Sequence, residues 1–253
     1  MLKLCANLSM LFSQKPMAER FAAARQAGFS AVEIQFPYDQ PISFWQEQLS
    51  THQLKLVLIN VPAGDLMSNG LGLAGAPGKE DEFEHALESA LRYGRELGVE
   101  AMNVLPGRLA EGADVEQALS TLRRNLLLAA ERMAEAGIRC TVEAINRHDM
   151  PGFLISGLAD LNSLPTHPNL YWQVDLYHMA RMDEDLNTIL EQHWQRIGHL
   201  QFADAPGRGA PGSGQLPFGQ LFRQIASSPY PYWSGAEYRD ASGDASWMAS
   251  LPA

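Results

Sequence analysis

Eight short apolar runs alternate with longer amphipathic segments along this chain, and the alternation constrains the fold more than any other feature of the sequence. The runs lie at residues 2–6, 31–36, 54–59, 101–105, 138–144, 170–174, 197–203 and 233–237. Several runs are apolar throughout, which is typical of strands that are covered on both faces. Strands that alternate with helices indicate a series of parallel β-α units.

Segments with apolar residues at helical spacing predict helices at residues 16–27, 41–52, 81–97, 115–136, 184–196 and 216–226. Gly28, Gly98 and Gly137 follow three of these segments, as expected where a helix stops. Residues 240–253 predict a short final helix or a tail. Eight β-α units in 253 residues favour one closed (β/α)8 TIM barrel, an α/β fold that takes up residues 1–253 as a single domain.

Composition narrows the classes of function that the chain can have. The net charge is −10 and no run of Lys or Arg exceeds two residues, so a basic face for nucleic acid is not expected. No stretch approaches the roughly 18 apolar residues of a membrane span, and we expect residues 1–12 to form the first strand rather than a secretion signal. Cys5 and Cys140 lack a second Cys or His at ligand spacing, which favours buried, reduced thiols in a cytoplasmic protein.

Polar residues lie in or at the end of four consecutive runs in the second half of the chain. Glu143, Asp175, Gln201 and Glu237 are separated by 32, 26 and 36 residues, about one β-α unit each. Equivalent positions on consecutive barrel strands are neighbours, so the four side chains are expected to converge at the C-terminal mouth of the barrel. Taken singly, each residue fits a helix cap or an ion pair better than a site. Four of them at consecutive strand ends favour a shared site.

The chemistry of this set predicts a divalent cation. Carboxylates at close range raise one another's pKa, and burial adds to the free-energy cost of their charges. A divalent ion removes the conflict. Because three carboxylates and one amide oxygen form an all-oxygen set, Mg²⁺ or Mn²⁺ suits them better than a metal that prefers thiolates. We therefore predict one such ion on Glu143, Asp175, Gln201 and Glu237.

Seven short motifs spread over residues 1 to about 240 resemble the hydroxypyruvate isomerase family of the xylose-isomerase-like barrel superfamily. They are ANLSMLF at 6–12, FPYD at 36–39, NVPAGD at 60–65, DLYHM at 175–179, HLQFAD at 199–204, PGRGAPGSG at 206–214 and EYR at 237–239. The 2-oxo-tetronate isomerases share these motifs, so the resemblance specifies the fold more closely than the substrate. Two departures are visible: Ala144 stands where the family usually has proline, and the tail after Tyr238 is short.

The resemblance implies roles for the strand-end residues. It implies that Glu143 and Glu237 are an acid/base pair that also contacts the metal, with Asp175 as a ligand. Gln201 matches a position where related sugar epimerases carry histidine. The implied reaction interconverts hydroxypyruvate and tartronate semialdehyde, and it moves a proton between adjacent carbons through an enediolate.

A small anionic hydroxy-keto acid would also need groups that bind it. Candidate cations near the predicted mouth are Arg108, Arg147, His148 and Arg208, with Arg208 the first choice because its loop is rich in Gly and Pro. Further candidates for substrate binding are His178, Asn7, Asn146 and His199. His178 fits either a substrate contact or a group that orients Asp175. His199 fits a buried structural role equally well, and Asn7 fits a turn.

Other functions remain open at this point. They are a 2-oxo-tetronate isomerase, a ketose 3-epimerase, and a non-catalytic sugar-acid binding protein on the same barrel. A metal-dependent endonuclease is disfavoured, because the sequence has no His clusters and no basic groove. Partners in the form of nucleic acid or membrane are not expected, and the sequence leaves homo-oligomerisation open.

Overall fold

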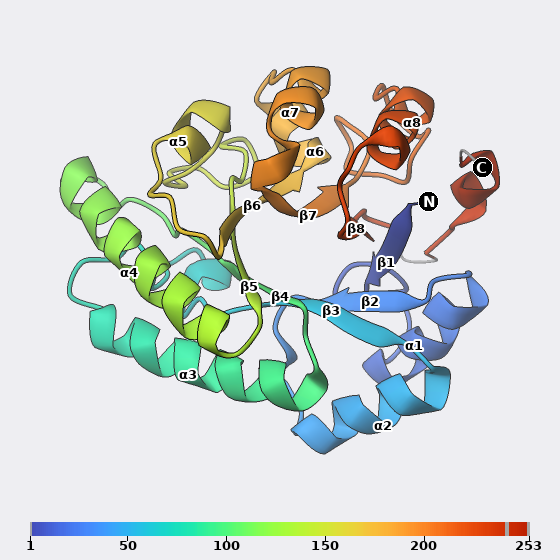
Figure 1. Ribbon diagram of the computed structural model, residues 1–253, viewed down its shortest axis with the longest axis horizontal. Coiled ribbons are helices and arrows are strands. Elements are labelled where there is room, and N and C mark those ends of the chain that lie inside the picture. The colour runs from blue at the N-terminus through green and yellow to red at the C-terminus, as the bar shows by residue number, and fades with distance from the viewer. Residues whose placement is uncertain (1, 241–242, 252–253) are drawn as a thin grey trace.

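The computed structural model describes residues 2–240 and 243–251, and within them eight parallel strands close into a barrel (Figure 1). The strands are β1 (Lys3–Asn7), β2 (Ala31–Ile34), β3 (Lys55–Asn60), β4 (Ala101–Val104), β5 (Arg139–Glu143), β6 (Leu170–Asp175), β7 (Ile197–Phe202) and β8 (Trp233–Ala236). Each strand pairs with the next in sequence, and β1 pairs with β8. The expectation of a (β/α)8 barrel is therefore confirmed.

Helices connect the strands and cover the outside of the barrel (Figure 1). They are α1 (Met17–Gln26), α2 (Ile42–His52), α3 (Glu80–Leu97), α4 (Val115–Glu135), α5 (Leu158–Asn162), α6 (Leu176–Arg181), α7 (Leu186–Gln192) and α8 (Phe218–Ser227). Local chemistry sets their ends. Asp114 accepts hydrogen bonds from two backbone N–H groups at the start of α4, and Gly98 closes α3 in the left-handed conformation with φ of 64°.

The structure differs from the helical prediction between residues 158 and 196 and at the C-terminal end. The helices α5 and α6 were not predicted, because helices of five and six residues are too short to show a helical period. The helix expected at 184–196 is divided into α7 and a 3-10 turn, Trp194–Arg196. The predicted final helix is represented by a 3-10 turn at Ser246–Ser250, while residues 241–242 and 252–253 of that prediction lie outside the described residues.

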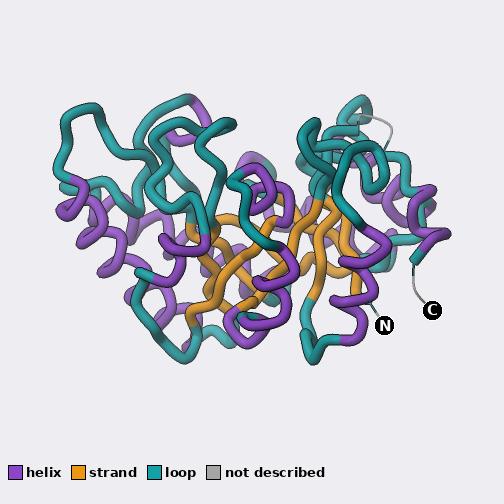
Figure 2. The backbone as a smooth tube through the Cα atoms, turned by 90° about the horizontal axis from the view of Figure 1, so that it is seen from above, coloured by secondary structure: helices purple, strands orange, loops and turns teal. Residues whose placement is uncertain are grey.

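The interior of the barrel changes character along its axis. Polar side chains from neighbouring strands are buried toward the C-terminal ends of the strands, and they include Asn7, Glu33, Asn103, Glu143, Gln173, Asp175 and Gln201. Long loops gather on one side of the strand layer (Figure 2). In the described part of the chain, none of the helices combines the length and apolar character that a membrane crossing requires.

The Glu33 carboxylate occupies the space beside Gly235 in β8, so a larger side chain would not fit at this position. A Cβ atom at this position would overlap Glu33 Oε2 and Oε1. We expect Gly235→Ala to lower the free energy of unfolding by about 1–3 kcal/mol, because a tightly packed interior must move to admit the methyl group. Urea unfolding monitored by circular dichroism measures this change.

Gly207→Ala is the matched control, because a Cβ there meets nothing within 4 Å. We expect its unfolding free energy to stay within about 0.5 kcal/mol of wild type. Equal stability of the two variants would contradict the packing assigned to Gly235.

Candidate active site

The four predicted metal ligands lie at the same end of the barrel. Glu143 and Asp175 are the last residues of β5 and β6, Gln201 is in β7, and Glu237 directly follows β8. Strand register sets Asp175 beside Gln201 and Glu143 beside Gln173. Gln173 Nε2 donates to Glu143 Oε2 at 3.1 Å and to Gln201 Oε1 at 2.8 Å. All four side chains are buried.

Two further side chains connect the three carboxylates. Arg208 Nη2 lies 2.5 Å from Glu237 Oε2 and 3.3 Å from Asp175 Oδ2. His178 Nε2 lies 3.6 Å from Asp175 Oδ2 and 4.0 Å from Glu143 Oε1. The structure therefore brings the predicted residues together. Their assignment as metal ligands and as an acid/base pair stays a prediction.

A cavity of about 250 Å³ opens over this cluster. Its wall includes Glu143, Gln173, His178, Gln201, Arg208 and Glu237. The wall thus combines carboxylates, amides and the largely buried guanidinium of Arg208, so a small polar molecule has charged and hydrogen-bonding groups on several sides.

The loop after β7 holds Arg208 in place. Asp204 Oδ2 accepts hydrogen bonds from the backbone N–H groups of Gly212 and Gly214, and its Oδ1 accepts one from Leu216. Arg208 itself adopts a φ of 55°, which is uncommon for a residue other than glycine. The hydrogen bonds to Asp204 support the loop around this residue, and strained backbone of this kind is often found at functional sites.

Burial and like charges make the carboxylates harder to ionise. Burial raises the pKa of Glu143 well above its ordinary value, and the charges of Glu237 and Asp175 raise it further. Burial also raises the pKa of Glu237 to about 7, although Arg208 lowers it. The pKa of Asp175 is raised by burial against the opposing effect of Arg208. A single guanidinium therefore does not balance three carboxylates.

His178 is a hydrogen-bond donor toward this site. Asn146 Nδ2 donates to Asp149 Oδ2 at 3.1 Å, which fixes the orientation of the amide, and it lies 2.6 Å from His178 Nδ1. His178 Nδ1 must therefore accept, and the proton of the neutral ring is on Nε2, facing Asp175. Burial, followed by Arg208, lowers the pKa of His178 well below its ordinary value, which favours the neutral ring. Although Glu143, Asp175 and His178 have the spacing of a metal cluster, a protonated Nε2 is not a ligand.

Three of the proposed substrate-binding residues lie behind the cavity wall. Asn7 Nδ2 donates to Glu237 Oε1 and to Glu33 Oε1, at 2.8 and 2.9 Å. His199 Nε2 lies 2.6 Å from Glu33 Oε2, and Asn146 holds His178. None of the three is among the described residues that line the cavity. Their bonds are to protein groups, so contact with substrate stays a prediction for them.

The candidate cationic side chains differ in whether they line the cavity. Arg208 and Arg108 line the cavity, and so does Arg239, which the sequence analysis did not single out. Arg147 is instead exposed and pairs with Asp160 at 3.6 Å. His148 is exposed and does not line the cavity.

Glu33, the fully buried acidic residue of β2, was not among the predicted site residues. Burial raises its pKa, but His199 and hydrogen bonds from Gln201 and Asn7 lower it below the ordinary value. A signal was present, because Glu33 interrupts the apolar run at 31–36 just as Gln201 interrupts its own. Asn103, which donates to Glu143 Oε2 at 2.9 Å, carried the same signal in β4.

The chain is similar to proteins of one known barrel family. The family model of the xylose isomerase-like TIM barrel matches residues 21–252. A hydroxypyruvate isomerase of Escherichia coli (strain K12) is 40% identical over 242 residues, which cover 94% of each chain. A 2-oxo-tetronate isomerase of Pectobacterium atrosepticum is 34% identical over 93% of this chain and 91% of its own length.

Solved structures agree with the fold. The crystal structure titled AP endonuclease, family 2, from Brucella melitensis superposes with a TM-score of 0.92 at 34% identity and covers 98% of both chains. An L-ribulose 3-epimerase superposes with a TM-score of 0.76 at 19% identity, over 99% of this chain and 86% of its own, which shows a shared fold alone. This chain belongs to the xylose isomerase-like TIM-barrel family and, within it, to the hydroxypyruvate isomerase-like isomerases.

Proposed function

We propose that this protein is a divalent-metal-dependent isomerase that interconverts hydroxypyruvate and tartronate semialdehyde. The observation that carries the proposal is the pair of buried glutamates, Glu143 and Glu237, in the wall of one cavity, each with a raised pKa. The 40% identity to a hydroxypyruvate isomerase over almost the whole chain supports the substrate.

The residues present fit a divalent cation. Glu143, Asp175 and Glu237 offer carboxylate oxygens, and Gln201 offers its Oε1, while Arg208 is the one guanidinium that pairs with them in the described residues. The excess of negative charge and the all-oxygen donors favour Mg²⁺ or Mn²⁺. Such an ion would supply Lewis-acid stabilisation of the negative charge that develops on the substrate oxygens.

The two glutamates are assigned to proton transfer. The reaction removes a proton from C3 of hydroxypyruvate and delivers one to C2, while the O3 proton is lost and O2 gains one, so the enediolate needs an acceptor and a donor within reach. A carboxyl with a pKa of about 7, as for Glu237, exchanges its proton readily near neutral pH. Glu143 is assigned to the other carbon. Its own raised pKa favours the protonated carboxyl, which can act as a proton donor.

The remaining wall residues are assigned to substrate binding. His178 presents Nε2–H as a donor to a substrate oxygen, and Arg208 presents a guanidinium from above the carboxylates. Arg108 and Arg239 line the same cavity and provide positive charge for the substrate carboxylate.

A second candidate is a 2-oxo-tetronate isomerase, which performs the same chemistry on an acid one carbon longer. Relatives with that name are 31–34% identical to this chain. Comparison of kcat/KM for the two acids decides between them. A preparation that binds hydroxypyruvate but never isomerises it would instead indicate a binding protein.

Replacement of either glutamate is expected to remove turnover. Glu143→Gln and Glu237→Gln should each lower kcat by about 10²-fold to 10⁴-fold, the usual contribution of a general acid or base. Circular dichroism checks that both variants are folded. The exposed Glu47→Gln on α2 is the control and should match wild type. Wild-type kcat in either site variant would refute the acid/base assignment.

Metal removal is expected to abolish isomerisation reversibly. Protein treated with EDTA should lose its activity on hydroxypyruvate and regain it with Mg²⁺ or Mn²⁺. The melting temperature should also rise with added ion, because a ligand that binds only the folded state stabilises it. If elemental analysis verifies that the metal has been removed and the protein is still fully active, the proposal is refuted.

We expect Glu237 to lower the stability of the metal-free protein as pH rises from about 4.5 to 7, while His178, whose pKa is lowered from 6.5, has the opposite effect below pH 6.5. The pKa of Glu237 is about 7 in the folded protein and 4.5 in the unfolded chain. Between these pH values the folded state binds a proton on Glu237 that the unfolded state has lost. The slope from one such group is at most about 1.4 kcal/mol per pH unit. The lowered pKa of Glu33 acts only below the window. In urea unfolding with EDTA, the free energy of unfolding of Glu237→Gln should fall less, or rise more, across this window than that of wild type. Identical slopes would contradict the prediction.

A further inference from the structure

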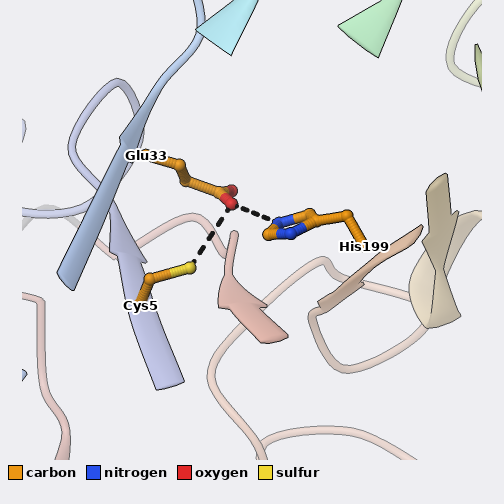
Figure 3. Close-up of side chains that lie close together, drawn as sticks. All are labelled: Cys5, Glu33 and His199. Atoms are coloured by element: carbon orange, nitrogen blue, oxygen red, sulfur yellow. Dashed lines mark hydrogen bonds and ion pairs between the residues drawn. The ribbon is translucent and has the colours of Figure 1, made fainter. Parts of the chain in front are cut away.

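Glu33 lies beneath the cavity, at the centre of a buried group of hydrogen-bond donors. Figure 3 shows Cys5 from β1 and His199 from β7 pointing at its carboxylate from either side. His199 Nε2 lies 2.6 Å and Cys5 Sγ 3.6 Å from Glu33 Oε2. The other oxygen, Oε1, accepts from Gln201 Nε2 at 2.7 Å and from Asn7 Nδ2 at 2.9 Å. Glu33 does not line the cavity, so it has no direct access to a substrate there.

The first chain of hydrogen bonds runs from Glu33 through Asn7. An ionised carboxylate only accepts hydrogen bonds, so the amide of Asn7 must turn its NH₂ group toward Glu33. The second hydrogen of the same NH₂ group is donated to Glu237 Oε1 at 2.8 Å. Asn7 Oδ1 faces away and accepts from the backbone N–H of Ser9. Glu33 and the Ser9 N–H thus favour the same orientation of the Asn7 amide, in which Glu237 receives an N–H group rather than a carbonyl oxygen.

The second chain runs through two glutamine amides. Because Gln201 must present Nε2 to Glu33, its Oε1 points the other way and accepts from Gln173 Nε2 at 2.8 Å. The second hydrogen of that NH₂ group is donated to Glu143 Oε2 at 3.1 Å. An amide oxygen has two lone pairs, so Gln201 Oε1 still has one for a cation.

We propose that Glu33 is a positioning residue that sets the direction of both chains, so that Glu143 and Glu237 each receive an N–H group and Gln201 presents its oxygen to the cation. This inference rests on the proposed function for the roles of those residues. Groups that orient metal ligands commonly matter almost as much as the ligands themselves.

Two substitutions at Glu33 separate the position of its acceptor oxygens from its charge. Glu33→Gln keeps the shape of the side chain. Its oxygen can still accept from Asn7 and Gln201, while its NH₂ group faces His199 Nε2, which accepts a hydrogen bond in the tautomer that carries the proton on Nδ1. Glu33→Asp keeps the charge but withdraws the carboxylate by one methylene, so it no longer reaches both amides.

The experiment measures Mn²⁺ affinity by calorimetry, and kcat and KM on hydroxypyruvate. We expect Glu33→Asp to lower Mn²⁺ affinity and kcat by about 10-fold to 100-fold with little change in KM, while Glu33→Gln stays within about threefold of wild type. Cys5→Ala is the matched control, because it removes a buried contact to Oε2 that lies on neither chain, and it should resemble wild type. Melting curves check that all three variants are folded.

The inference is overturned if Glu33→Asp matches wild type, or if Glu33→Gln falls as far as Glu33→Asp, since charge would then be decisive. Two bound Mn²⁺ ions per chain would also overturn it, because Cys5, Glu33 and His199 would then form a metal site of their own. Crystal structures of metal-free wild type and Glu33→Asp give a readout that needs neither turnover nor metal. Asn7 and Gln201 should shift in the variant, and unchanged side chains would refute the inference even if the wild type proved to be inactive.

Discussion

Three carboxylates crowded around one guanidinium inside the barrel are the constraint on which the rest of the site depends. Glu143, Asp175 and Glu237 are buried, and Arg208 pairs with two of them. In a low-dielectric interior such an arrangement is costly unless each charge is compensated or hydrogen-bonded. The raised pKa values of the three carboxyls express that cost. Such a site is stabilised by additional positive charge, either from a bound cation or from a proton on one of the carboxyls.

The amides around the carboxylates follow from the same constraint. Asn103 donates to Glu143, and Gln35 and Asn7 donate to Glu237. Each supplies an N–H group without adding charge, so the carboxylates keep fixed orientations while the net charge of the site is unaltered. Preorganised dipoles of this type reduce the reorganisation that a reaction needs. At this end of the barrel the interior therefore holds carboxylates that are fixed by hydrogen bonds, whereas the helices outside supply the apolar packing.

The barrel and the four strand-end residues were predictable because both depend on regular spacing. One β-α unit separates Glu143 from Asp175, and parallel register then places them on adjacent strands. Glu33 was equally predictable, since it too is a charged residue in an apolar run, but the prediction considered only the second half of the chain. The short helices α5 and α6 could not be predicted, because a few residues do not establish a helical period.

By itself the sequence determined the order of strands and helices, and which acidic residues would lie at the mouth of the barrel, because local periodicity and strand alternation control both. Only the tertiary structure decided which donor meets which acceptor. Asn7 bonds Glu237, 230 residues away, and Asn146 selects the proton position of His178 across 32 residues. Such pairs depend on how the barrel closes and on the paths of its loops, and no local pattern in the chain records that geometry.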